Sequence, residues 1–124
     1  MSKKLERLKA MQKSIIGFDY DNPKECLKAV KENGDALKFV REQTEEICLE
    51  AVKQDGFALK FVKDQTKEIC LEAVKQDGLA LKYAREQTKE ICLEAVKENG
   101  LALNYVKDLS MIEEYFDDDL NLIK

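Results

Sequence analysis

The sequence contains no histidine, no tryptophan and only one proline. Without histidine it lacks the side chain that most often serves as a general base near neutral pH. No apolar run approaches the ~20 residues that a membrane helix needs. Residues 1–20 show no unbroken apolar stretch and no small-residue cleavage site. We therefore expect a cytoplasmic protein that is not an enzyme and has neither a signal peptide nor a membrane segment.

Neither sign of charge is in large excess. Lysine and arginine total 21, aspartate and glutamate total 25, and the net charge is −4. A mildly acidic chain is poorly suited to coating nucleic acid or an anionic membrane, so both are disfavoured as partners. Apolar residues make up 44% of the chain. That share is enough for a core and argues against wholesale disorder.

The chain repeats itself every 22 residues. The cysteines Cys26, Cys48, Cys70 and Cys92 and the glycines Gly34, Gly56, Gly78 and Gly100 keep this spacing. In this register the copies occupy residues 22–43, 44–65, 66–87 and 88–109, between an amino-terminal segment (1–21) and an acidic tail (110–124). We take residues 1–124 as one repeat domain. A fixed period of this length indicates a repeat architecture.

The pattern within each copy predicts two short helices. In the second copy Thr44 can accept a hydrogen bond from an amide of the first turn. Asp55-Gly56 then ends the first helix, because glycine can adopt the left-handed conformation after a C-cap. The second helix is expected from about Phe57 to Asp64. In the first copy Asn22 takes the place of the threonine, followed by Pro23 at the first helical position.

Both helices of a copy have wide apolar faces. At about 100° per residue the first helix of the second copy places its apolar residues within an arc of roughly 200°. These residues are Ile47, Cys48, Leu49, Ala51 and Val52. One hairpin cannot bury two such arcs, and helices this short are unstable alone. The sequence therefore predicts an all-α fold, a short α-solenoid of four 22-residue helical hairpins with a capping helix at each end.

The end caps are predicted from the flanking segments. Residues 3–16 are expected to form an amphipathic helix over the first unit. At the other end Ser110 and Glu113 have the spacing of a capping box. The tail residues expected to cover the last unit are Met111, Ile112, Tyr115, Phe116, Leu120 and Ile123. The run Asp117, Asp118 and Asp119 is expected to remain in water.

The repeated string ICLEAVKQDGxALKxVxxQT resembles a family of tandem helical repeats of unknown function, found in bacteria, protists and large viruses. The resemblance covers residues 22–109 and rests on the recurring Cys-Leu, Ala-Val, Gly and Ala-Leu positions. It implies a helical array, and it implies no activity, cofactor or site residue. The first copy departs from the pattern in a way that suits an end unit, with Glu25 where the others have Ile47, Ile69 and Ile91.

The repeat spacing also constrains the four cysteines. Equivalent positions in stacked units lie about 10 Å apart. A disulfide needs α-carbons within ~7 Å, and zinc needs four ligands at ~2.3 Å. We therefore expect buried free thiols, no metal and no cofactor, with Cys26 the most exposed and reactive because it lies beside Glu25 in an end unit. The polar groups recur along an axis instead of converging, so no catalytic residue is predicted.

Two columns of charge are predicted along the stack. The acidic column, on the first helices, comprises Glu46, Glu50, Glu68, Glu72, Glu90 and Glu94. The cationic ladder, on the second helices, comprises Lys38, Arg41, Lys60, Lys63, Lys82, Arg85 and Lys107. Acidic residues next to the ladder weaken its field. The columns are either solvated surfaces with weak ion pairs or faces for charged partners.

An aromatic column accompanies the cationic ladder. It consists of Phe39, Phe61, Tyr83 and Tyr105, and it either packs in the core or remains half exposed as an anchor for a partner. Charge also differs between the two ends. Residues 1–21 have a net charge of +2 and residues 110–124 a net charge of −4. This difference allows either a monomer or a weak head-to-tail oligomer.

The function predicted from the sequence is a non-catalytic protein–protein interaction module. In one form it is a small acidic inhibitor or decoy that blocks a basic, nucleic-acid-binding surface of a cellular machine such as a nuclease. The acidic column, with Asp117, Asp118 and Asp119, would supply that surface. Two alternatives remain open. One is a structural or self-assembling array, natural or a designed consensus, and the other is weak nucleic-acid binding through the cationic ladder, which its acidic neighbours disfavour.

Overall fold

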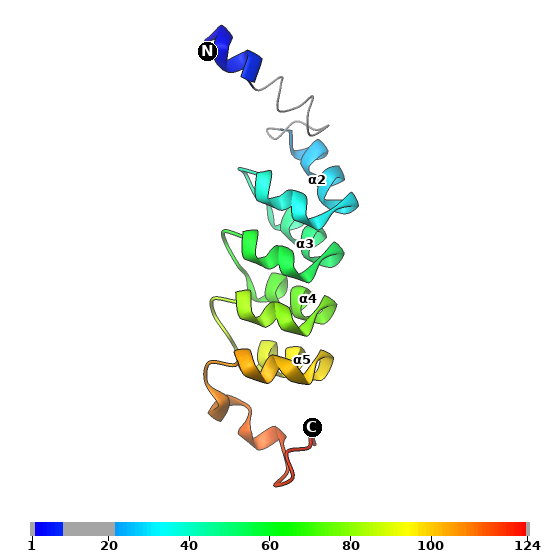
Figure 1. The fold of residues 1–124 in the computed structure, drawn as a ribbon, viewed down its shortest axis with the longest axis vertical. Coiled ribbons are helices and arrows are strands. Elements are labelled where there is room, and N and C mark those ends of the chain that lie inside the picture. Colours follow the sequence, from blue (N-terminus) through cyan, green and yellow to red (C-terminus); the bar gives the residue numbers. More distant parts are fainter. Residues whose placement is uncertain (1, 9–21, 124) are drawn as a thin grey trace.

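The computed structural model describes residues 2–8 and 22–123. Four units, each an α-helix followed by a short 3₁₀ helix, stack in single file into an α-solenoid (Figure 1). The α-helices are α2 (Pro23–Glu32), α3 (Glu45–Gln54), α4 (Lys67–Gln76) and α5 (Lys89–Glu98). The 3₁₀ helices are η1 (Gly34–Phe39), η2 (Gly56–Phe61), η3 (Gly78–Tyr83) and η4 (Gly100–Tyr105). Each α-helix packs against the α-helix of the next unit, and each 3₁₀ helix against the next 3₁₀ helix.

The helix starts agree with the sequence prediction. The Thr44 hydroxyl accepts a hydrogen bond from the Ile47 amide at 3.1 Å, and Thr66 and Thr88 repeat this bond. In the first unit the Asn22 side chain accepts from the amides of Lys24 and Glu25. Local side-chain chemistry therefore fixes where each α-helix begins. Residues 3–8 are also helical, while residues 9–16 of the expected amino-terminal cap lie outside the described residues.

The second helix of each unit differs from the prediction. It is a six-residue 3₁₀ helix that ends at Phe61, well before Asp64. Asp55 is extended, at φ −151° and ψ 109°, and its side chain accepts from the Phe57 amide at 2.9 Å. Asp55 thus ends α3 and begins η2 with no intervening turn. Val62 is extended because residues 62–66 must return the chain to the start of the next α-helix (Figure 1).

The repeat glycines serve a purpose other than the predicted left-handed cap. None of the four has a φ in the left-handed region. A Cβ added to Gly56 would lie 2.5 Å from the carbonyl oxygen of Ala73, in α4 of the next unit. Glycine is therefore required by close backbone approach between units. Gly100, in the last unit, has nothing within 4 Å of such a Cβ.

The core is a column of small and branched apolar side chains that runs the length of the stack. The middle unit α3–η2 contributes Ile47, Cys48, Ala51, Val52, Ala58, Leu59 and, just after η2, Val62. Ile47, Cys48, Ala51 and Val52 belong to the apolar arc predicted for the first helix, while Leu49, Phe57 and Phe61 are only partly buried. Among the described residues no polar or charged side chain is buried.

The carboxyl-terminal cap differs from the predicted helix. It consists of two 3₁₀ turns, η5 (Leu109–Met111) and η6 (Glu113–Tyr115). Asp108, and not Ser110, caps the first turn, since its carboxylate accepts from the Ser110 amide at 3.1 Å. Ile112 is buried and Met111 and Phe116 are partly buried, as expected.

Two residues of the tail do not cover the last unit as predicted. Leu120 is 81% exposed and Ile123 is also exposed. The Asp117 carboxylate accepts hydrogen bonds from the amides of Asp119 and Asn121 and folds residues 117–121 into a tight turn. Leu120 lies in that turn with φ 65°, and its side chain points away from the core.

A glutamine clamp joins each unit to the next. The Gln65 side chain donates to the carbonyls of Tyr83 at 2.9 Å and Leu59 at 3.2 Å, and it accepts from the Arg85 amide at 2.9 Å. Gln43 and Gln87 make the corresponding bonds one unit earlier and one unit later. This role of the glutamines was not predicted from the sequence. The signal was present, because glutamine recurs at these positions and Leu109 replaces it in the last copy.

Gly56 approaches the backbone of the next unit closely, and Gly100 does not. Substitution by alanine should therefore change the free energy of unfolding differently at these two positions. Gly56→Ala should destabilise the protein by about 1–3 kcal/mol, because the new methyl group meets the Ala73 backbone. Gly100→Ala should be neutral or stabilising by up to about 1 kcal/mol, because its site is open and the unfolded chain loses freedom. Urea denaturation of both variants measures the two changes. Equal changes would contradict the inter-unit contact.

The clamp predicts a loss of stability on Gln65→Ala. The substitution leaves the Tyr83 carbonyl and the Arg85 amide without their partner, which should lower the free energy of unfolding by about 1–3 kcal/mol. Gln54→Ala, at an exposed position of α3, is the matched control and should change it by less than about 0.5 kcal/mol. A similar change in the two variants, measured by urea denaturation, would show that the clamp contributes no stability.

Candidate interaction surfaces

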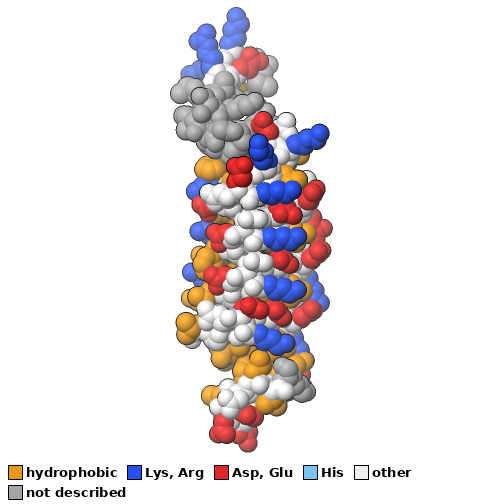
Figure 2. All heavy atoms as spheres, turned by 90° about the vertical axis from the view of Figure 1, so that its right-hand side faces the viewer, with side chains coloured by type: hydrophobic (Ala, Val, Ile, Leu, Met, Phe, Trp, Pro, Cys, Tyr) orange, Lys and Arg blue, Asp and Glu red, His pale blue; other side chains and the backbone are white. Residues whose placement is uncertain are grey.

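The acidic column is interrupted by basic side chains. Glu50 pairs with Lys53 at 3.8 Å, and Glu90 pairs with Lys67 of the preceding unit. Glu72 accepts a hydrogen bond from Gln76. Figure 2 shows red and blue side chains interleaved along this side of the stack. The predicted residues do share one side of the α-helices, but they do not form a field of a single sign.

The three aspartates of the tail, Asp117, Asp118 and Asp119, do not all have the same role. The Asp117 carboxylate is only partly exposed and holds the tight turn, so the expectation that it remains in water is wrong for this residue. Asp118 and Asp119 are exposed, as expected. Only these two carboxylates of the run are therefore directed to solvent.

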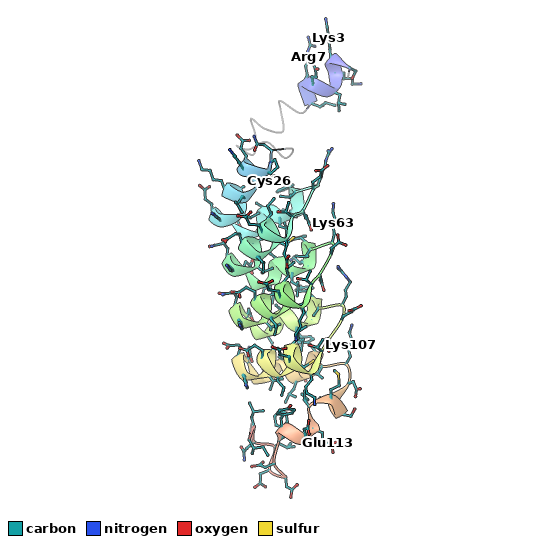
Figure 3. All side chains as sticks on the ribbon, turned by 180° about the vertical axis from the view of Figure 1, so that it is seen from behind. Lys3, Arg7, Cys26, Lys63, Lys107 and Glu113 are labelled. Atoms are coloured by element: carbon teal, nitrogen blue, oxygen red, sulfur yellow. The ribbon has the colours of Figure 1, made fainter. Side chains whose placement is uncertain are left out.

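Three members of the cationic ladder are structural. Lys63 Nζ donates to the Arg41 carbonyl at 2.9 Å, and Lys107 Nζ donates to the Arg85 carbonyl at 3.1 Å. Arg85 binds the carbonyl of Val62 in the same way, at 3.0 Å. Each of these side chains reaches back to the loop of the preceding unit, on the edge where Figure 3 labels Lys63 and Lys107. They bridge units, a role that the charge pattern did not indicate.

The remaining lysines of the ladder lie over aromatic rings. Lys60 Nζ is 5.0 Å from the ring centre of Phe61 and 5.8 Å from that of Tyr83. Lys82 Nζ is 5.0 Å from Tyr83, 5.8 Å from Phe57 and 6.0 Å from Tyr105. Each ammonium group is therefore shared between rings of different units. Such cation–π contacts hold the lysines in place with about 0.5–1 kcal/mol each at exposed sites.

The aromatic column is half exposed, so it does not pack wholly in the core. Phe39 is 40% exposed, Tyr105 is also exposed, and Phe61 and Tyr83 are partly buried. Phe57 joins the column through an edge-on contact with Tyr83, at 6.0 Å between ring centres. We call this surface the aromatic–lysine strip; it comprises Lys38, Phe39, Phe57, Lys60, Phe61, Lys82, Tyr83 and Tyr105.

The strip offers cations without acidic partners. Lys38 pairs with Asp35 at 3.2 Å, but no carboxylate in the described part of the chain pairs with Lys60 or Lys82. A shallow hollow of about 300 Å³ continues the strip between the first two units and is lined by Phe39, Arg41 and Phe61 among others. The strip therefore combines open apolar area with unpaired N–H donors.

All four cysteines are free and buried. Cys26 is only 2% exposed, so the prediction that it is the most exposed thiol is wrong. The side chains of Cys26 and Val30 are the buried side chains of α2, so the neighbouring Glu25 does not bring the thiol to the surface. Burial, with the nearby carboxylates of Asp64 and Glu45, raises the pKa of Cys48 to about 11.

The described residues contain no metal-binding cluster. In residues 2–8 and 22–123 no group of three or more His, Cys, Asp or Glu side chains is placed to hold a metal ion. The same residues include no helix that is both long enough and apolar enough to cross a bilayer.

The raised pKa of Cys48 predicts slow thiol chemistry in the folded protein. At pH 8 the thiolate fraction is about 100-fold below that of a thiol with the ordinary pKa of 9.0. Ellman's reagent should therefore label Cys48 in the native protein at least about 100-fold more slowly than in the protein unfolded in urea. The folded state binds the Cys48 proton more tightly than the unfolded state does. The contribution of this proton to the free energy of unfolding is therefore complete below pH 9.0 and is lost as the pH rises towards 11. Rapid labelling of the native protein would contradict the buried placement.

Comparison with known proteins supports the repeat family. A family model described as "Domain of unknown function (DUF4116)" matches residues 26–67, 44–89 and 66–109. No curated protein and no solved structure matches the chain. The overlapping matches advance along the chain by about one unit each, and together they cover more than half of it. The chain therefore belongs to this tandem-repeat family of unknown function.

Proposed function

We propose that this protein is a non-catalytic protein-binding module whose aromatic–lysine strip binds an extended acidic segment of a partner. The observation that carries the proposal is the placement of Lys60 and Lys82. Each lies over rings of two or more units and has no carboxylate partner among the described residues. The partner would supply carboxylates to these ammonium groups and apolar side chains to the rings between them.

The strip is favourable for binding because its donors are held in place before a ligand arrives. Ordering a free lysine side chain costs conformational entropy, and the ring contacts have already limited that freedom. An ammonium group has three N–H donors and no acceptor, so an anionic partner is its natural complement. Half-exposed tyrosine and phenylalanine side chains are typical of residues that dominate binding energy at interfaces.

The other two charged-surface hypotheses have less support. The acidic inhibitor remains a prediction, and Glu50 and Glu90 of its surface already pair with lysines. It depends on the other predicted carboxylates that face solvent or lack a lysine partner among the described residues, namely Glu46, Glu68, Glu72, Glu94, Asp118 and Asp119. Nucleic-acid binding is disfavoured because three cations of the ladder already donate structural hydrogen bonds to backbone carbonyls. The exposed acidic residues beside the ladder would also repel phosphate; they are Glu42, Asp64, Glu86 and Asp108.

The proposal predicts that the double variant Lys60→Gln, Lys82→Gln loses affinity for an acidic peptide. The probe is a labelled 12-residue peptide that alternates glutamate with leucine or phenylalanine, measured by fluorescence anisotropy. Affinity should fall about tenfold or more, because two charge-assisted contacts are lost. Far-ultraviolet circular dichroism would show that the stack remains folded.

A matched control removes the same charge elsewhere. Lys75→Gln with Lys97→Gln, both exposed on α-helices, should change the affinity by less than about twofold. Equal losses in the two double variants would mean that net charge, and not the strip, governs binding. Tighter binding of a single-stranded RNA of the same length would favour the nucleic-acid hypothesis instead.

A further inference from the structure

The carboxyl-terminal end of the stack exposes a face that every other unit buries. Leu59 and Leu81 are 0% exposed, whereas Leu103 at the equivalent position of η4 is 38% exposed. Gly100 is exposed and its Cβ position is open, in contrast to Gly34, Gly56 and Gly78. In the middle units the next 3₁₀ helix covers this face. The tail after η4 is joined to α5 by the ion pair between Glu114 and Lys89 at 2.8 Å, and it leaves Leu103 of η4 exposed.

A groove lies between η4 and the tail. It has a volume of about 830 Å³, and its apolar lining comprises Leu103, Leu109, Ile112, Phe116 and Leu120. Its charged lining residues are all acidic, namely Glu113, Asp117 and Asp118. Orange side chains gather at this end in Figure 2, above red ones at the tip. The groove therefore fits a helix that carries apolar side chains and positive charge.

The helix of residues 3–8 has that composition. Leu5 and Leu8, three residues apart, are 43% and 51% exposed and lie on one side of the helix. Lys3, Lys4 and Arg7 supply three cations against one anion, Glu6. Lys3 and Arg7 lie at the opposite end of the molecule from Glu113 (Figure 3). A contact between this helix and the groove would therefore join two copies.

We propose that the helix of residues 3–8 docks in the carboxyl-terminal groove of a second copy, head to tail. Leu5 and Leu8 fill the apolar floor, and Lys4 and Arg7 face Glu113 and Asp118. The face of the first unit that would meet another whole unit is less open, because Ala29 and Ala36 are already partly buried. The contact is heterologous, so it can propagate from copy to copy.

Charge reversal in solution tests the contact. Sedimentation velocity at low salt should show association of the unmodified protein, with a dissociation constant on the order of 100 μM for so small an interface. Lys4→Glu with Arg7→Glu, or Glu113→Lys with Asp118→Lys, should weaken association about tenfold or more. Glu46→Lys with Glu68→Lys makes the same change in charge away from the groove and should leave association within about twofold.

Mixing the two reversed variants gives the decisive result. In either variant alone, the helix and the groove carry charge of the same sign and repel each other. In the mixture, the acidic helix of one variant can bind the basic groove of the other. Association should return in the mixture and weaken as salt is added. A protein that remains monomeric at about 1 mM would overturn the proposal. So would association that survives in either reversed variant, or a mixture that stays monomeric.

Discussion

The stack depends on the contact between the 3₁₀ helix of each of the first three units and the α-helix of the next unit. The contact is close because glycine opens each 3₁₀ helix, which lets the backbone at Gly56 reach the carbonyl of Ala73. A hairpin of 22 residues cannot bury two wide apolar faces by itself, and its helices would not persist in water. The core therefore forms only in the array, because each unit buries its apolar side chains together with those of its neighbours.

The polar groups follow the same dependence on neighbours. Residues 62–66 return the chain to the next α-helix, and the Lys63 amide and the Val62 carbonyl find their partners in neighbouring units. Gln43 accepts from the amide of Lys63, and Arg85 donates to the carbonyl of Val62. Three of the seven residues of the cationic ladder, Lys63, Arg85 and Lys107, thus hold the stack together. Lys38, Lys60 and Lys82 lie over the rings, and Lys38 already pairs with Asp35. The surface available to an anionic ligand is therefore narrower than the charge pattern indicated.

The structural features that depend on local side-chain chemistry and on the 22-residue repeat could be predicted from the sequence. The threonine caps, the buried faces and the single-file stack follow from residues a few positions apart and from the repeat of 22. Contacts between units were harder to predict. A left-handed cap and a close approach both require glycine, and only the position of the next helix decides between them at Gly56. The exposure of Leu120 depends on a turn fixed by Asp117, whose carboxylate the sequence analysis assigned to water.

The middle and the ends of the array are suited to different kinds of recognition. Lys82 contacts rings of η2, η3 and η4, so the elements of the strip exist only between units and repeat along the stack. An extended partner would gain a similar contribution from each unit, and its affinity would rise with the number of units it spans. The end groove has no counterpart in the middle units, because the next unit occupies that place. Docking at the groove would leave the strip open, so the two proposed contacts are compatible in one assembly.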